Sequence, residues 1–289
     1  RDLVTIGCDL NVRNVDGETP LILALRERKV GVARLLLTSD IDVTVVDKDG
    51  SSCLHLAVCI PALDLVKKIV AMGVDINKVN DEGNTPLLIA AQKLHRNIFK
   101  FLLENGADIA VRNRIGYSCL HHVTEDNFDF IDDLISMGAD VNEETLRGDT
   151  PLNLYIRGSY VELSTVKLLV NSGADVSKIH RPTGNSCLHF AANKAESAIV
   201  EYLLTMEVSV DLRNDSGDTA LHLAVKRRNV EITELLLAYG ADITITDYRS
   251  GNTYLHNAVT LGNADLVKVL IKYGADVNAT NNNGDTPLS

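Results

Sequence analysis

Apolar residues along the chain occur in short clusters with helical spacing, separated by polar turns. In one representative stretch, Leu221 and Ala224 lie three residues apart on one helix face. A second apolar run, 232–237, follows, and Gly240 comes three residues after its end. Thr219 precedes the first run as a helix N-cap, and Gly240 has the position of a left-handed C-cap. The pattern predicts a unit of turn, helix, helix and turn.

This unit is repeated along the whole chain. Each copy begins with a glycine, which supplies the positive φ of a tight turn. Thr or Ser follows two residues after the glycine, and Leu four residues after it, in every copy. Consecutive glycines are 32 to 36 residues apart, and a period of this length indicates a solenoid. The glycines are Gly17, Gly50, Gly83, Gly116, Gly148, Gly184, Gly217, Gly251 and Gly284.

The period predicts one elongated domain, 1–289, with a continuous core in which each unit contacts only its neighbours. Because the chain begins in the middle of a unit and ends just after a cap, we expect a fragment of a longer protein. The predicted boundaries are a partial repeat 1–13, eight repeats at 14–46, 47–79, 80–112, 113–144, 145–180, 181–213, 214–246 and 247–280, and a partial repeat 281–289.

Proline follows the capping threonine in four copies, at the first helical position, and Leu-His follows in five copies. With its period of about 33 residues, this pattern resembles the ankyrin repeat. The resemblance covers the chain and implies an all-α solenoid, an array of helix-turn-helix units with β-hairpin or turn connections. It also implies that hairpin tips and first helices line a concave binding groove.

Charge and cysteine content narrow the possible partners. The net charge of −11 argues against nucleic acid, whose phosphates require a basic surface. An odd count of five cysteines without clustering is not a disulfide framework. Cys53, Cys119 and Cys187 fill the proline position, where we expect reduced, half-buried thiols. Reduced thiols indicate the cytosol, which includes the cytosolic face of a membrane compartment, or the nucleus. No apolar run is long enough to span a membrane.

Several units depart from the pattern. One residue is missing between the helices of the unit that begins at Gly116, and two are inserted within 155–162. The hairpins at 180–183 and near Tyr248 each have one extra residue. Drift in a tolerant solenoid explains such changes, and a recognition feature at 155–162 and 180–183 is the functional alternative. Asp40 and Glu207 replace the glycine that ends the second helix, where left-handed geometry is expected.

The chain offers no catalytic, cofactor or metal site that we can identify. Its histidine row lies one repeat apart, so no two imidazoles would share a metal. The family resemblance instead implies imidazole hydrogen bonds to backbone between hairpins. Asp47 to Gly50 lacks the later ligands of a calcium loop. We therefore expect no enzyme activity, no cofactor and no metal. The row comprises His55, His121, His189, His222 and His256.

Binding surface remains as the place for function. The resemblance assigns recognition to residues that flank the tip glycines and to two positions after each first helix. A run of apolar residues on neighbouring units beside acidic ones is a candidate interface. A basic alternative lies around Lys194, Lys226 and Arg227. The favoured partner-binding residues are Val46, Ile60, Val79, Lys93, Arg114, Ile115, Tyr117, Glu125 and Asp126.

These observations favour a non-catalytic scaffold or adaptor that binds a protein or peptide through its concave groove and hairpin tips. The expected partner carries apolar anchors and basic flanks, and the fragment itself is expected to be a monomer. A groove formed before binding loses little ordering entropy. Two alternatives remain open: a structural tether of a membrane protein, and a regulatory module of a larger enzyme.

Overall fold

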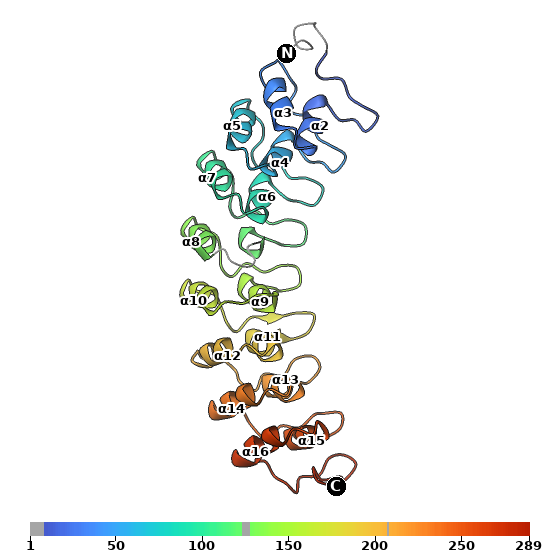
Figure 1. Cartoon of the computed structure of the whole chain (residues 1–289), viewed down its shortest axis with the longest axis vertical. Helices are drawn as coiled ribbons and strands as arrows, with labels where there is room; N and C mark the ends of the chain where they lie inside the picture. The colour runs from blue at the N-terminus through green and yellow to red at the C-terminus, as the bar shows by residue number, and fades with distance from the viewer. Residues whose placement is uncertain (1–8, 123–127, 207) are drawn as a thin grey trace. The chain divides into compact units, whose positions relative to one another are not determined.

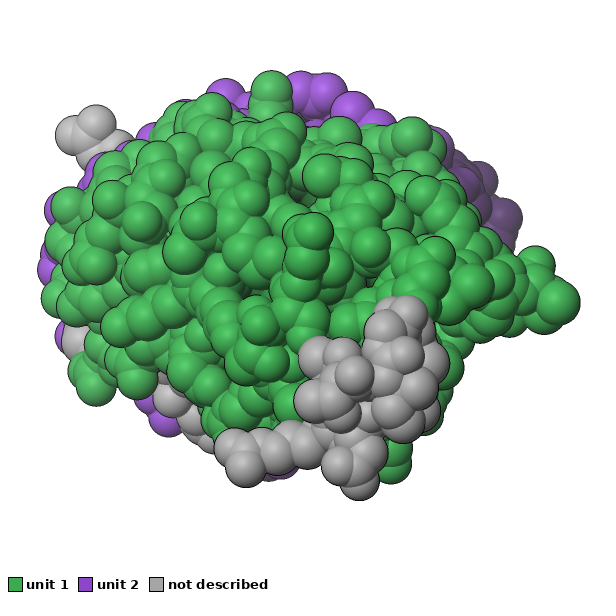
Figure 2. Space-filling view, turned by 90° about the horizontal axis from the view of Figure 1, so that it is seen from above, with its two compact units in different colours: residues 1–140 green, residues 141–289 purple. Residues whose placement is uncertain are grey.

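A computed structural model describes residues 9–122, 128–206 and 208–289. The chain divides into two compact units, unit 1 at residues 1–140 and unit 2 at residues 141–289, which are coloured separately in Figure 2. The helices of unit 1 are α2 (Pro20–Arg26), α3 (Val30–Leu36), α4 (Cys53–Val58), α5 (Leu63–Ala71), α6 (Pro86–Gln92), α7 (Arg96–Glu104), the 3-10 helix η1 (Cys119–His122) and α8 (Phe128–Ser136).

Unit 2 contains eight further helices and one two-stranded antiparallel sheet among its described residues. Its strands pair Ile179 with Ser186 and His180 with Asn185. The elements are α9 (Pro151–Arg157), α10 (Leu163–Asn171), β1 (Ile179–His180), β2 (Asn185–Ser186), α11 (Cys187–Lys194), α12 (Ser197–Leu204), α13 (Ala220–Lys226), α14 (Val230–Ala238), α15 (Tyr254–Thr260) and α16 (Ala264–Lys272).

Within each unit, first helices pack on first helices and second helices on second helices. In unit 1, α4 contacts α2 and α6, while α5 contacts α3 and α7 (Figure 1). In unit 2, α11 contacts α9 and α13, while α12 contacts α10 and α14. Leu, Ile, Val and Ala side chains fill the space between the row of first helices and the row of second helices, so the core is continuous within each unit. The fold is the all-α repeat solenoid that the sequence predicts.

Hydrogen bonds at the helix starts explain why the chain turns where it does. The Thr85 hydroxyl accepts from the backbone N–H of Leu88, and Thr19, Thr150 and Thr219 cap their helices in the same way. At the hairpin tip, Gly83 shows two reasons why a glycine is required. Its φ is +79°, and an added Cβ would lie 2.8 Å from the backbone nitrogen of Arg114 on the next hairpin.

Polar side chains connect successive hairpins inside each unit. The Asn113 amide donates to Oδ1 of Asn84 at 3.0 Å in unit 1, and the Asn214 amide donates to Oδ1 of Asn185 at 2.7 Å in unit 2. Backbone bonds join the tips directly, because the Arg114 N–H donates to the Glu82 carbonyl at 2.9 Å. These bonds hold neighbouring hairpins in register without a continuous sheet.

Three members of the histidine row have the structural role that the family resemblance implies. Nδ1 of His55 accepts the Ser52 backbone N–H at 3.1 Å, so Nε2 carries the proton and donates to the Asn84 carbonyl at 2.9 Å. His189 and His256 make the same bonds to the carbonyls of Asp218 and Asp285. Each of these imidazoles therefore caps its own helix and ties it to the following hairpin.

Two helix predictions are wrong. Among its described residues, the unit that begins at Gly116 has a 3-10 turn, Cys119–His122, where the other units have a first α-helix. Asp40 is not left-handed, since the non-glycine described residues with positive φ are Arg28, Leu94, Ala195 and Arg228. Helix α3 ends earlier, at Leu36, and the Thr38 hydroxyl donates to the Leu35 carbonyl. Glu207 lies outside the described residues.

The glycines that end the second helices are left-handed as predicted, whereas the left-handed residues that carry a Cβ occur where first helices end. Arg28 has φ +52°, and the next N–H, of Lys29, donates to the Ala24 carbonyl at 2.8 Å. This is the bond of a Schellman C-cap, a position that favours glycine. Gly262 holds the equivalent position near the C-terminus, with φ +65°. The sequence gives no signal for this geometry at Arg28, because the backbone bond imposes it on a residue that carries a Cβ.

Substitution of Arg28 by glycine is expected to stabilise the protein. The left-handed conformation costs a residue with a Cβ about 1–2 kcal/mol, and the extra unfolded-state entropy of glycine offsets about 0.5–1 kcal/mol of that gain. Urea melts of Arg28→Gly should therefore show a gain of up to about 1 kcal/mol. Gly262→Ala is the matched control and should lose a similar amount. A destabilised Arg28→Gly would show that the cap geometry carries no strain.

Candidate functional site

Four of the predicted binding residues of unit 1 are accessible. Val79 and Ile115 have 52% and 55% of their surface exposed. Lys93 and Arg114, which lie between them in the sequence, are exposed as well. Val79 and Ile115 belong to successive hairpins, which the backbone bond from Arg114 to Glu82 joins. Val79 comes just before the turn 80–83 and Ile115 lies within the turn 113–116, so both exposed apolar side chains are available to contact a partner.

The structure places three other predicted residues differently. Ile60 is 4% exposed, so its prediction as a groove residue is wrong. It lies in the turn before Pro61, where spacing alone does not reveal the side-chain direction. Val46 is half-buried and bridges to Ser52. Tyr117 is also half-buried, because its ring stacks on His121 at 5.5 Å between centroids and contacts His122 at 5.4 Å.

The structure does not describe the two acidic residues of the predicted groove. Glu125 and Asp126 lie outside the described residues. The neighbouring hairpin tips do carry exposed carboxylates, at Asp49, Asp81 and Glu82. The tips of these two repeats therefore present negative charge beside Val79, which suits a partner with basic residues.

A buried carboxylate and a cation eight residues later form a recurring pair that the sequence analysis missed. Glu18 pairs with Arg26 in unit 1, and Asp149 with Arg157 and Asp218 with Lys226 in unit 2. The Asp218 side chain is 10% exposed and accepts from Nζ of Lys226 at 2.6 and 2.8 Å. Lys226 is therefore neutralised within its own repeat.

The alternative binding surface around Lys194, Lys226 and Arg227 consequently carries less available positive charge than its three basic residues suggest. Nζ of Lys194 is buried, and no hydrogen-bond partner for it is found in the described part of the chain. Arg227 is exposed and donates from Nε to Oδ1 of Asn193 at 3.0 Å. Arg227 is therefore the one residue of these three whose charged group is exposed and has no carboxylate partner among the described residues.

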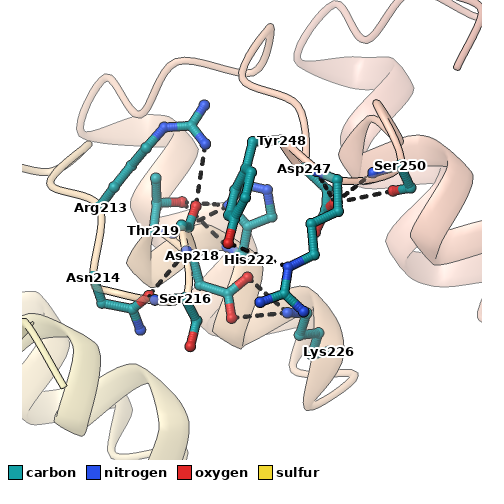
Figure 3. Close-up of polar contacts among 12 residues, drawn as sticks. Arg213, Asn214, Ser216, Asp218, Thr219, His222, Lys226, Asp247, Tyr248 and Ser250 are labelled. Carbon is teal, nitrogen blue, oxygen red and sulfur yellow. Dashed lines mark hydrogen bonds and ion pairs between the residues drawn. The ribbon is translucent and has the colours of Figure 1, made fainter. Parts of the chain in front are cut away.

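Polar contacts in unit 2 concentrate where the hairpin 246–252 follows the hairpin 213–218 (Figure 3). The Arg213 guanidinium donates to the carbonyls of Gly217 at 3.1 Å and Thr246 at 3.2 Å. Tyr248 lies over Gly217, where an added Cβ would meet its ring at 2.2 Å. Tyr248 is nevertheless 56% exposed. Arg213 thus links two hairpins, and an aromatic ring covers the junction.

The extra residue of this hairpin breaks the histidine link of the preceding repeat. The Asp247 N–H donates to the Asn252 carbonyl, five residues on, whereas the Asn80 N–H donates to Asn84, four residues on. Nε2 of His222 has no hydrogen-bond partner among the described residues, and burial lowers the pKa of His222 to about 4. The Tyr254 hydroxyl bonds the capping Thr219 at 3.0 Å instead.

The other bulged hairpin, β1–β2, also lacks a hydrogen bond from the histidine position of the preceding repeat. Asn153 replaces histidine in the repeat before the β1–β2 hairpin and is 0% exposed. Neither polar atom of its amide has a hydrogen-bond partner in the described residues. Both bulged hairpins of unit 2 therefore lack the hydrogen bond that a histidine of the preceding repeat donates to a regular hairpin. Bulges of this kind re-aim side chains and are enriched near functional sites.

The described residues give little scope for metal or thiol chemistry. Among them, no group of three or more His, Cys, Asp and Glu residues could hold a metal ion. Cys53, Cys119 and Cys187 are at most 1% exposed, so they are more deeply buried than predicted. Burial raises the pKa of each thiol to about 12, which keeps them protonated. In the same described ranges, no helix is both long and apolar enough to cross a bilayer.

The repeat geometry agrees with the comparison to known families. A family model described as ankyrin repeats in three copies matches residues 1–78, 54–145, 120–214 and 152–247. A second, described as ankyrin repeats in many copies, matches residues 248–289. The chain belongs to the ankyrin repeat family. Repeats of this family generally mediate protein–protein interaction and are generally not catalytic.

Relatives share the repeats within proteins of different kinds. The chain is 34% identical over 134 residues to the ankyrin repeat protein FPV031 of Fowlpox virus (strain NVSL), covering 45% of the chain and 39% of that protein. It is 31% identical over 164 residues to the nuclear factor NF-kappa-B p105 subunit of Gallus gallus, covering 54% of the chain and 17% of that subunit.

A third relative carries an enzyme name. The protein ZDHHC13 of Danio rerio, named as a palmitoyltransferase, is 31% identical over 131 residues, which cover 45% of the chain and 20% of that protein. The matched segments thus span well under two thirds of the length of these relatives. Similarity is confined to the repeats, so the relatives' own activities do not transfer to this chain.

Proposed function

We propose that the protein is a non-catalytic scaffold that binds a partner protein or peptide through the hairpin tips and first helices of unit 1. The exposed apolar pair Val79 and Ile115, on successive hairpins joined by backbone hydrogen bonds, is the observation that carries this proposal. Exposed apolar side chains on neighbouring repeats mark a surface that a partner can bury, and burial of apolar area favours association. Lys93, Arg114 and the half-buried Tyr117 would border the contact.

The charge of the tips indicates the kind of partner. Asp49, Asp81 and Glu82 are exposed on the hairpins of these repeats, and Glu125 and Asp126, which lie outside the described residues, remain proposed binding residues. A partner with apolar anchors flanked by Lys or Arg would match this pattern in both shape and charge. The net charge of −11 supports a protein ligand over nucleic acid. The buried free thiols support a reducing compartment, the cytosol or nucleus.

The double substitution Val79→Asp with Ile115→Asp is expected to abolish capture of a partner from a cell extract. Burial of the exposed half of each side chain should contribute about 1 kcal/mol to binding. A carboxylate in its place would have to be desolvated and should weaken binding further. Both side chains are more than half exposed, so the helical circular dichroism signal and melting temperature should be preserved. Quantitative mass spectrometry of the captured proteins provides the measurement.

Val32→Asp is the matched control, because Val32 is 51% exposed on the second helix α3 of the same unit. This variant should capture the partner as the unaltered chain does. If the double variant retains its partners, or if Val32→Asp loses them equally, the apolar pair of the tips is not the binding site.

A further inference from the structure

The junction of the hairpins 213–218 and 246–252 in unit 2 forms a second surface with a different chemistry. We call it the arginine–tyrosine surface and define it by Arg213, Tyr248 and Arg249. All three side chains are exposed, and Tyr248 retains 56% of its surface. The surface belongs to the bulged hairpin, which no histidine ties to the preceding repeat.

Neutral groups hold both guanidinium groups in place. Arg213 donates to the carbonyls of Gly217 and Thr246. Nε of Arg249 donates to the Tyr248 hydroxyl at 3.2 Å, and its charged carbon lies 5.6 Å from the centre of that ring. Arginine has five N–H donors, so each group still has donors for a ligand. The geometry is set before a ligand arrives, which reduces the entropy cost of binding.

The positive charge of this surface is not cancelled by ion pairs. Within the described residues, neither Arg213 nor Arg249 has a carboxylate oxygen within ion-pair distance. The Tyr248 hydroxyl, and then the charges of two nearby acids, Asp247 and Asp218, raise the pKa of Arg249, but both acids also have other partners. Asp218 accepts from Lys226, and the Asp247 carboxylate accepts the backbone N–H groups of Arg249 and Ser250 at 2.9 Å. Two guanidinium groups therefore face solvent beside an exposed aromatic ring.

We propose that the arginine–tyrosine surface binds an acidic peptide segment of a partner protein. Guanidinium groups recognise carboxylates through paired, charge-assisted hydrogen bonds, and arginine clusters are a common means of binding acidic motifs. The Tyr248 ring offers an apolar face between the two groups for the peptide stem. This surface is distinct in chemistry from the acidic tips of unit 1, and the inference does not depend on the unit 1 groove.

The overall charge of the protein makes the test specific. A chain of net charge −11 repels acidic peptides in general, so binding of one requires a local basic site. The probe is a fluorescein-labelled peptide of alternating Glu and Ala residues, and its Gln–Ala counterpart is the reference. Fluorescence anisotropy with the full chain should show binding of the acidic peptide alone, weakened by added salt.

Substitution of the two arginines should remove this binding. Arg213→Gln with Arg249→Gln is expected to weaken it by about tenfold or more, because both charge-assisted contacts are lost. Lys268→Gln with Lys272→Gln removes the same charge from α16 and should leave affinity within about twofold, since these lysines already pair with Asp265 and Glu234. Arg249→Gln alone, which alters no backbone bond, should still cost about threefold if the double variant folds poorly.

Equal binding of the Glu and Gln peptides, or an equal loss in the α16 control, would overturn the inference. Val79 and Ile115 are unchanged in every variant of this experiment. An acidic peptide that does not bind therefore overturns this inference alone, whereas failure of the whole chain to capture any partner overturns the proposed function alone.

Discussion

Acidification from about pH 7 to about pH 5 should destabilise the protein by several kcal/mol, before most of its carboxylates are protonated. Burial lowers the pKa of His222 and of His122 to about 4 from the usual 6.5. Burial also lowers the pKa of His55 and His189. Between these two pH values the unfolded chain binds more protons than the folded one. The free energy of unfolding therefore falls as pH falls through 6.5, and the loss for His222 is complete below about 4.

The shift at His222 corresponds to about 3 kcal/mol at its limit, since each pKa unit is worth about 1.4 kcal/mol. Hydrogen bonds from Thr44 and Ser177 lower the pKa of Asp42 and Asp175, and that contribution to stability is lost only at lower pH. The loss of stability from histidine protonation thus begins at a higher pH than the loss from carboxylate protonation, and the two overlap below about pH 5. Urea melts at several pH values provide the measurement.

His222→Gln, which cannot titrate, is the variant that isolates one site. Its free energy of unfolding should depend less steeply on pH between 6.5 and 4 than that of the unaltered chain, by about one proton. A urea midpoint that stays constant from about pH 7 to about pH 5 would contradict the burial of neutral imidazoles.

Removal of the cation that pairs with Asp218 is the second change with a large expected effect. Lys226→Met would leave a carboxylate that is only 10% exposed without its cation. An unpaired buried charge costs up to about 3–5 kcal/mol, and because the Lys226 side chain is 48% exposed we expect about 2 kcal/mol after solvent screening. Urea denaturation gives the difference directly.

Two further variants separate charge from packing. Asp218→Asn combined with Lys226→Met should recover part of the loss, since no unpaired charge then remains in the site. Lys268→Met breaks an exposed pair with Asp265 and should cost less than about 0.5 kcal/mol. If Lys226→Met is as mild as Lys268→Met, the buried pair does not contribute to the stability of the repeat.

Local sequence signals predict the parts of the fold that depend on one or two residues. Gly83 has the predicted positive φ, and Thr85 has the predicted cap bond. The period places His55 one repeat from the next hairpin, so its bond to the Asn84 carbonyl could be anticipated from the family. A positive φ or a helix N-cap can be predicted from the sequence because few residue types satisfy either requirement.

Features that depend on the direction of a side chain in an irregular segment could not be predicted. Ile60 occupies a predicted groove position, but the turn around Pro61 directs it into the core. Arg28 is left-handed because of a backbone bond that its residue type does not reveal. The Asp218–Lys226 pair could have been found from its spacing of eight residues, which recurs in two other repeats. The chemistry of the 246–252 hairpin required the positions of Tyr248 and Arg213.

The exact repeat boundaries and the partner-binding residues remain predictions. Helix ends mark where each unit turns, but they do not fix which residue of a hairpin belongs to which repeat. Exposure of Val79 and Ile115 makes them available for contact, and only a complex can assign them to an interface.

Crosslinking mass spectrometry of the full chain with its captured partner tests the central claim most directly. If the hairpins and first helices of unit 1 bind the partner, an amine-reactive crosslinker should join it to Lys48 and Lys93, at a hairpin tip and at the end of α6. Lys67 and Lys100 are equally exposed, on the second helices α5 and α7, and should not be crosslinked to the partner. Crosslinks confined to Lys67 and Lys100 would contradict the proposed recognition surface.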